Sequence, residues 1–106
     1  NVKELEKVKI LRYENGGKYK WHTDCGARET SLRKLTAIIQ LSDETKYEGG
    51  NLEFGITDKS GKNNYTAPRT RGSITIFPSF LSHRVTPVTK GRRYSLITWM
   101  LGDCFV

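Results

Sequence analysis

A chain of 106 residues is long enough for one domain and too short for two. Its 18 basic and 11 acidic residues give a formal net charge of +7, which suits an anionic partner or simply a solvated basic surface. The two cysteines, Cys25 and Cys104, lie far apart in the sequence. They exclude a disulfide-rich scaffold and a zinc site of paired cysteines, although a single disulfide stays open.

No apolar run approaches the roughly 20 residues that cross a bilayer, so no membrane partner is expected. The N-terminal residues lack the apolar core of a secretory signal, which makes a cytoplasmic location the default expectation. The first residue is asparagine rather than methionine, so the sequence is either a minimal protein or an excised piece of a longer one.

Short β-type runs separated by turn residues dominate the chain. Taken in order, the predicted strands cover residues 8–13, 18–22, 35–41, 51–56, 72–77, 85–88 and 93–101. Turns or loops are predicted at 14–17 and 42–50, and a polar segment at 58–68. With about seven strands and no convincing long helix, residues 1–106 are expected to form one antiparallel sandwich or barrel domain.

Three residues have the composition of a metal site. His22 and Asp24 are two positions apart, so in an extended segment both side chains reach the same face. Each histidine taken alone is equally compatible with a surface or packing role. Together with His83, however, they supply two imidazoles and one carboxylate, the set that holds non-haem Fe(II) and leaves coordination positions open. A zinc hydrolase could use the same ligands.

The last predicted strand carries a cation on an otherwise apolar face. By the period of two, Arg93 and Ser95 share one face with Ile97 and Trp99. A buried arginine needs an anionic partner, and a dicarboxylate cosubstrate would provide one to its planar fork. The alternative is an exposed arginine on an edge strand. Arg92, which points the opposite way, is expected to be the exposed neighbour.

The order of these motifs along the chain resembles the prolyl 4-hydroxylase-like branch of the 2-oxoglutarate/Fe(II)-dependent dioxygenase superfamily. The resemblance runs from Val8 to Trp99 and rests on the following segments: Tyr13…Tyr19-x-x-His22-x-Asp24, residues 35–42, Tyr47-Glu48-Gly49-Gly50-x-Leu52-x-Phe54, residues 72–79, His83-Arg84-Val85-x-Pro87-Val88, Gly91-x-Arg93-Tyr94-Ser95, and Trp99.

The resemblance implies a double-stranded β-helix, or jelly roll, with Fe(II) near one mouth. His22, Asp24 and His83 match the metal ligands of the family, and Arg93 matches the residue that binds the distal carboxylate of 2-oxoglutarate. These four form the expected catalytic set. The resemblance further implies a cosubstrate pocket lined by Ser95, Tyr13, Gln40, Ile38 and Trp99. Gln40 departs from relatives that carry a tyrosine there, and Trp99 is expected to pack beneath the cosubstrate.

The implied activity is hydroxylation of an unactivated carbon, with dioxygen and 2-oxoglutarate consumed, succinate formed and ascorbate as an auxiliary reductant. A prolyl residue in a peptide or protein is the favoured substrate, and a small molecule is second. Two alternatives stay open. An alkylation-repair dioxygenase would suit the net charge, but such enzymes carry a second arginine where this chain has Trp99. A non-catalytic jelly-roll module would not need all four catalytic residues. Relatives also carry helices before the first core strand, which this sequence lacks.

Overall fold

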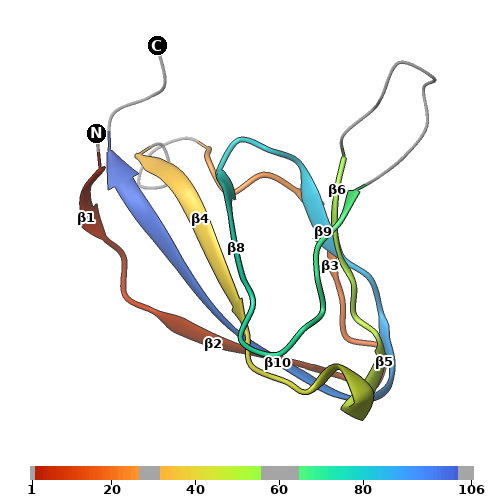
Figure 1. Ribbon diagram of the computed structural model, residues 1–106. Coiled ribbons are helices and arrows are strands. Elements are labelled where there is room, and N and C mark those ends of the chain that lie inside the picture. Colours follow the sequence, from red (N-terminus) through yellow and green to blue (C-terminus); the bar gives the residue numbers. More distant parts are fainter. Residues whose placement is uncertain (1, 27–31, 56–64, 103–106) are drawn as a thin grey trace.

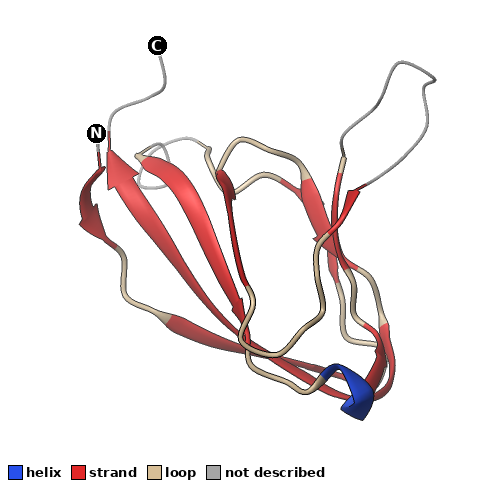
Figure 2. Ribbon diagram, viewed as in Figure 1, coloured by secondary structure: helices blue, strands red, loops and turns tan. Residues whose placement is uncertain are grey.

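The computed structural model describes residues 2–26, 32–55 and 65–102, and strands dominate this part of the chain (Figures 1 and 2). The strands are β1 (Val2–Leu5), β2 (Lys9–Glu14), β3 (Tyr19–His22), β4 (Arg33–Gln40), β5 (Tyr47–Gly49), β6 (Leu52–Phe54), β7 (Tyr65–Thr66), β8 (Ile74–Pro78), β9 (His83–Val85) and β10 (Val88–Gly102). The one helix in these residues is the 3-10 turn η2 (Glu44–Lys46). None of the described helical structure is long and apolar enough to cross a membrane.

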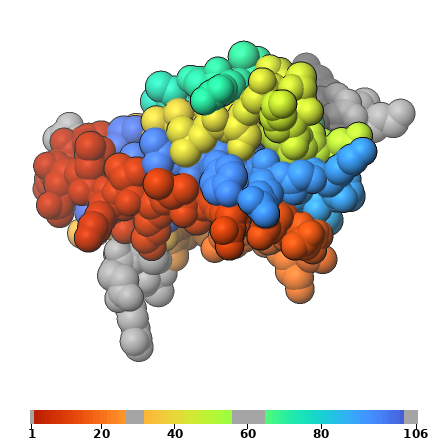
Figure 3. Space-filling model, turned by 90° about the horizontal axis from the view of Figure 1, so that it is seen from below, coloured from red at the N-terminus to blue at the C-terminus, as the bar shows by residue number. Residues whose placement is uncertain are grey.

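The strands form two antiparallel sheets that curl toward each other (Figure 1). The larger has the order β1–β10–β4–β8, with β2 and β5 also paired to β10, and the smaller has the order β3–β9–β6–β7. Seen from below, the red N-terminal strands and the blue β10 lie side by side along one face (Figure 3), as their pairing requires. This arrangement confirms the predicted mainly-β jelly roll.

The long strand β10 connects the regions of the larger sheet because it changes partner along its length. On one side Val88 to Gly91 pair with β5, whereas Arg92 to Ile97 pair with β2 and Met100 to Gly102 with β1. Ser95 to Leu101 also pair with β4. Gly91 lies at the change, with φ of +72°, and a Cβ there would overlap the Lys46 carbonyl oxygen. Only glycine permits this bend.

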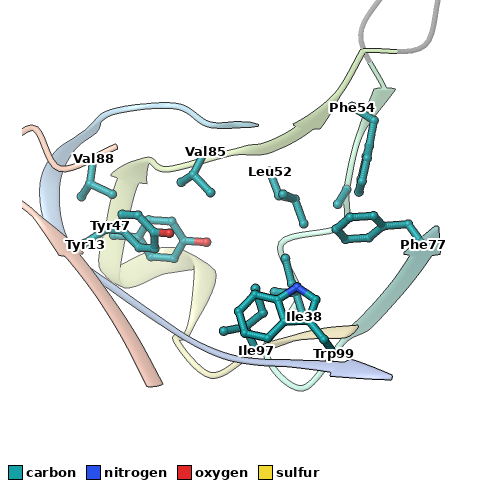
Figure 4. Close-up of a cluster of buried hydrophobic side chains, with 11 residues drawn as sticks. Tyr13, Ile38, Tyr47, Leu52, Phe54, Phe77, Val85, Val88, Ile97 and Trp99 are labelled. Carbon is teal, nitrogen blue, oxygen red and sulfur yellow. The ribbon is translucent and has the colours of Figure 1, made fainter. Parts of the chain in front are cut away.

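The core lies between the two sheets. In β10 the side chains alternate as predicted: Arg93, Ser95, Ile97 and Trp99 are buried, whereas the residues between them are partly exposed. Side chains of both sheets point toward one another in Figure 4, with Ile38, Ile97 and Trp99 facing Leu52 and Val85. The inner face of the larger sheet therefore forms one wall of the functional site.

Several predicted boundaries need correction. The predicted strand at 85–88 is wrong, because β9 ends at Val85 and β10 begins at Val88, with Pro87 between them unable to donate a ladder hydrogen bond. The predicted loop at 42–50 contains η2 and the short strand β5, and β1 was not predicted. Cys104 and most of the predicted polar segment 58–68 lie outside the described residues.

Candidate metal centre

Two strands of the smaller sheet bring both histidines together. His22 ends β3, His83 begins β9, and the two residues are partners in the antiparallel ladder. Asp24 follows β3 by two residues, and its backbone N–H donates to the Ser79 carbonyl at 2.9 Å. This backbone hydrogen bond fixes the turn that directs the carboxylate back toward the two rings.

One oxygen of Asp24 faces both imidazoles. The Oδ1 atom lies 3.2 Å from His22 Nε2 and 3.4 Å from His83 Nε2. One ligand atom from each of the three residues falls within 4.8 Å of the others, so a single ion could contact all three. The structure thus brings together the three residues that the sequence predicted as metal ligands.

The other ring nitrogen of each histidine already has a partner. His22 Nδ1 lies 2.6 Å from the Lys20 carbonyl oxygen, and His83 Nδ1 lies 2.9 Å from the Leu81 carbonyl oxygen. A carbonyl accepts only from N–H, so the proton of a neutral ring belongs on Nδ1 and the Nε2 lone pair points into the site. This is the tautomer that a metal ligand requires.

The second oxygen of Asp24 is held from the opposite side. The Thr36 hydroxyl donates to Oδ2 at 2.7 Å, and the Trp99 indole N–H donates to the same atom at 3.0 Å. Burial would raise the pKa of Asp24, but hydrogen bonds lower it far below its usual value: those that Nε2–H of His22 and His83 donates when no metal is bound, and those from the Thr36 hydroxyl and the Trp99 indole. The carboxylate is therefore ionised and oriented at neutral pH.

This donor set fits a divalent first-row metal. Two imidazole nitrogens and one carboxylate oxygen, each with its orientation fixed by a second contact, form the facial set typical of non-haem Fe(II) with open positions. Burial lowers the pKa of His22, whereas the hydrogen bonds to Asp24 and to the Lys20 carbonyl raise it and outweigh burial. A bound metal ion would displace the proton from His22 Nε2.

Arg93 lies on the wall of the same cavity. Its side chain is buried, with 3% of the residue exposed, and the guanidinium carbon lies 5.4 Å from the centre of the Tyr13 ring. Burial lowers the pKa of Arg93, and the phenols of Tyr47 and Tyr13 oppose the shift. None of these groups carries a negative charge, so an anionic ligand would supply the partner that the desolvated guanidinium needs.

The cavity joins Arg93 to the metal ligands. Its volume is about 140 Å³, and the same walls carry Arg93 and all three candidate metal ligands. Its walls include the predicted residues Tyr13, Ile38, Ser95 and Trp99, together with others from both sheets: Lys9, Leu11, Tyr19, Leu52, Val85 and Ile97. Thr36, Ile38 and Gln40, at alternate positions of β4, are all buried.

Gln40 is buried but does not line this cavity. Its side-chain N–H donates to the Tyr47 hydroxyl at 2.6 Å, and Tyr47 in turn lies beside Arg93. Sequence reasoning missed Tyr47 because the residue was assigned to a loop. The signal was present in the following Gly49-Gly50 pair: both glycines have positive φ, and a Cβ on Gly50 would lie 3.1 Å from the Arg93 side chain and 3.4 Å from the Tyr47 ring.

Two further contributions to the site were not predicted. Trp99 was expected to pack beneath the cosubstrate, and the structure adds a hydrogen bond from its indole to Asp24. Thr36 holds the same oxygen, and its hydroxyl is also 3.0 Å from that of Ser79. Each comes from a strand other than those that carry the ligands, which is why spacing in the sequence did not reveal them.

Comparison with known proteins agrees with this geometry. A family model described as the 2OG-Fe(II) oxygenase superfamily matches residues 8–101. A PKHD-type hydroxylase of Synechococcus sp. (strain CC9605) is 32% identical over 99 residues, covering 93% of this chain and 43% of that protein. The chain spans less than half the length of the curated relatives it matches first.

Solved structures show the same fold. A prolyl-4-hydroxylase of Pseudomonas putida superposes with a TM-score of 0.77 at 24% identity, covering 94% of this chain and 54% of that one. A prolyl hydroxylase of Trichoplax adhaerens, in complex with a hypoxia-inducible-factor peptide fragment, gives a TM-score of 0.76 at 18% identity, covering 93% and 44%. The extent of the family match establishes that the chain belongs to the 2OG-Fe(II) oxygenase superfamily, whose members use Fe(II), 2-oxoglutarate and dioxygen.

Proposed function

We propose that this chain is the catalytic domain of a hydroxylase that inserts one oxygen atom of dioxygen into an unactivated C–H bond of a prolyl residue in a peptide or protein. The observation that carries the proposal is the placement of a 2-His-1-carboxylate cluster and a buried arginine in one cavity. A metal site alone would also serve a hydrolase, whereas the added cation suits a dicarboxylate cosubstrate.

Each residue has a role that follows from its position. His22, Asp24 and His83 would hold the ion, and Arg93 would bind the distal carboxylate of 2-oxoglutarate with the Ser95 hydroxyl beside it. When bound, Fe(II) supplies the activation of dioxygen that couples substrate hydroxylation to conversion of 2-oxoglutarate into succinate and carbon dioxide. The apolar cavity walls exclude water and orient both reactants.

The metal side of the cavity suits a ring-shaped apolar group. Tyr19 lines the cavity and is half exposed, and its ring stacks on His22 with centroids 3.9 Å apart. Leu11 and Val85 lie on the same walls. These surfaces would contact a pyrrolidine ring, and the exposed Lys9 would face an acidic group near the target residue.

The test combines two measurements on the purified chain with Fe(II), 2-oxoglutarate and ascorbate. Succinate formation reports cosubstrate turnover, and mass spectrometry of proline-containing peptides reports the gain of one oxygen atom. We expect both, with the oxygen on proline and no product from matched peptides in which alanine replaces proline. Succinate without peptide product would reject the prolyl substrate, and absence of both would reject the enzyme in favour of a non-catalytic module.

A further inference from the structure

An irregularity in the larger sheet turns an arginine toward the metal centre. Thr36 pairs with Trp99 and Leu35 with Met100, but the next pair is Arg33 with Leu101, so Lys34 is an extra residue in β4. Strict alternation would place Arg33 on the outer face together with Leu35. The bulge instead aligns it with Leu101, which packs against the core on the same face as Trp99.

The turned side chain covers Trp99 and is itself held by Glu6. The guanidinium carbon of Arg33 lies 3.8 Å from the centre of a Trp99 ring. Its Nε and Nη2 atoms donate to the two carboxylate oxygens of Glu6 at 2.7 and 3.2 Å. This paired geometry is the strongest that arginine makes with a carboxylate.

Glu6 is anchored to the same strand that carries the tryptophan. Its backbone N–H donates to the Trp99 carbonyl at 2.8 Å, and its own carbonyl accepts from the Thr98 hydroxyl at 2.8 Å. The contacts therefore close a ring through Glu6, Arg33 and Trp99. From this ring the indole N–H reaches Asp24 Oδ2 at 3.0 Å.

We propose that Arg33 and Glu6 are positioning residues for the metal centre: they fix the Trp99 ring so that its N–H holds Oδ2 of Asp24 and leaves Oδ1 for the ion. The inference rests on the proposed metal site. Neither residue touches the metal ligands' side chains, and the one other contact with a ligand residue is from Arg33 Nη1 to the backbone carbonyl oxygen of Asp24, at 3.5 Å. A partly exposed ion pair contributes little to stability by itself. Their contribution would appear as metal affinity, because residues behind a ligand commonly change affinity by about 10- to 100-fold.

A second Arg–Glu–Trp arrangement in the same chain provides the matched control. Arg84 pairs with Glu53 at 2.7 Å and lies 4.7 Å from a Trp21 ring. Trp21 is 41% exposed and, unlike Trp99, is not among the groups that hydrogen-bond to Asp24. The Arg84→Met variant therefore removes the same chemistry without touching the carboxylate.

The experiment measures Mn²⁺ affinity of the full chain by electron paramagnetic resonance. We expect Trp99→Phe to weaken binding about 10- to 100-fold. Arg33→Met and Glu6→Gln should weaken it roughly 2- to 30-fold, the range of a cation–π contact. Arg33→Met added to Trp99→Phe should cause no further loss, since its effect passes through the indole N–H. A further loss would assign the effect to the contact of Arg33 with the Asp24 carbonyl oxygen and overturn the route through the indole. Wild-type affinity in Arg33→Met and Glu6→Gln, or an equal loss in Arg84→Met, would overturn the proposal.

A readout on the metal-free protein separates this inference from the proposed function. Nuclear magnetic resonance of the indole N–H follows its exchange with solvent, which the hydrogen bond to Asp24 slows. We expect faster exchange of the Trp99 signal in Arg33→Met and Glu6→Gln, and no change in Arg84→Met. If exchange is unchanged in the first two variants, Arg33 and Glu6 do not position Trp99, even where the enzyme is active. If the wild type binds no metal, the proposed function fails. The exchange rates then still show whether Arg33 and Glu6 position the Trp99 ring.

Discussion

Arg93 is a cation in a buried position, and its replacement by an apolar side chain should change stability and ligand affinity in opposite directions. The groups that most affect its pKa after burial are two phenols, Tyr47 and Tyr13, and the cation of Arg69. None of these is a carboxylate, so among the residues that the structure describes the buried charge has no anionic partner. The desolvation of such a charge lowers the stability of the ligand-free protein, and a bound anion offsets that loss.

The expected magnitudes follow from that position. Removing one partner of a buried, hydrogen-bonded charge pair weakens binding by about 2–5 kcal/mol, or about 30- to 4,000-fold in affinity. Replacing a buried charge by an apolar group of similar volume is neutral or stabilises a protein by about 1–4 kcal/mol. Arg93→Met should therefore bind 2-oxoglutarate far more weakly while the metal-free protein unfolds at the same or higher urea concentration.

The assay is calorimetric titration of 2-oxoglutarate into the Mn²⁺-loaded protein without oxygen, with urea unfolding measured on metal-free samples. Arg92→Met is the matched control, because the Arg92 side chain is 65% exposed and pairs with Glu14 at 2.6 Å. We expect this control to alter both quantities by less than about 0.5 kcal/mol. Unchanged 2-oxoglutarate affinity in Arg93→Met, together with lost stability, would show that Arg93 is a structural residue.

Three other expectations concern different parts of the molecule. The raised pKa of His22 stabilises the metal-free fold below the unfolded pKa of about 6.5, and this contribution is lost as pH rises through the higher folded value. Thermal melts across that range should show the stability of the metal-free protein falling with pH, and falling less in His22→Gln. The affinity of the wild type for the metal should rise over the same range. Gly49→Ala should destabilise the protein more than Gly16→Ala does. Both glycines have positive φ, which costs an alanine about 1–2 kcal/mol, but only at Gly49 would the added Cβ overlap a backbone oxygen, that of Pro87. Equal urea midpoints of the two variants would contradict this expectation. Because Trp99 stands where alkylation-repair enzymes carry a second arginine, a single-stranded oligonucleotide should bind at most weakly and lose that binding as salt is raised. Tight binding at physiological salt would revive that alternative.

The site could be predicted largely because its residues lie on regular strands. On β10 the period of two places Arg93 and Ser95 on the buried face with Trp99, and the structure agrees. The spacing of His22 and Asp24 predicted that both side chains reach one site, but Asp24 lies in a bend beyond β3, where its backbone hydrogen bond to Ser79 directs the carboxylate. Their meeting with His83 depends on the pairing of β3 with β9, which no local pattern specifies and which the family resemblance supplied.

What escaped prediction depends on departures from regular geometry. The extra residue Lys34 reverses the face on which Arg33 lies, and alternation cannot reveal a bulge before the partner strand is known. Pro87 separates β9 from β10 within the segment 85–88, which its β-branched residues predicted to be one strand. Tyr47 belongs to a three-residue strand, too short for a periodic signal, although its hydroxyl accepts a hydrogen bond from Gln40. The effect of Pro87 is local, whereas the bulge and the position of Tyr47 depend on contacts between distant segments.

The most direct test of the metal centre is an anaerobic calorimetric titration of Fe(II) into the metal-free chain and into its Asp24→Ala variant. The geometry predicts one ion per wild-type chain, bound through His22, His83 and the carboxylate of Asp24, and no saturable binding in the variant. The variant should still unfold cooperatively, which separates a lost ligand from a lost fold. A wild-type chain that binds no Fe(II), or a folded variant that binds it equally well, would contradict the account.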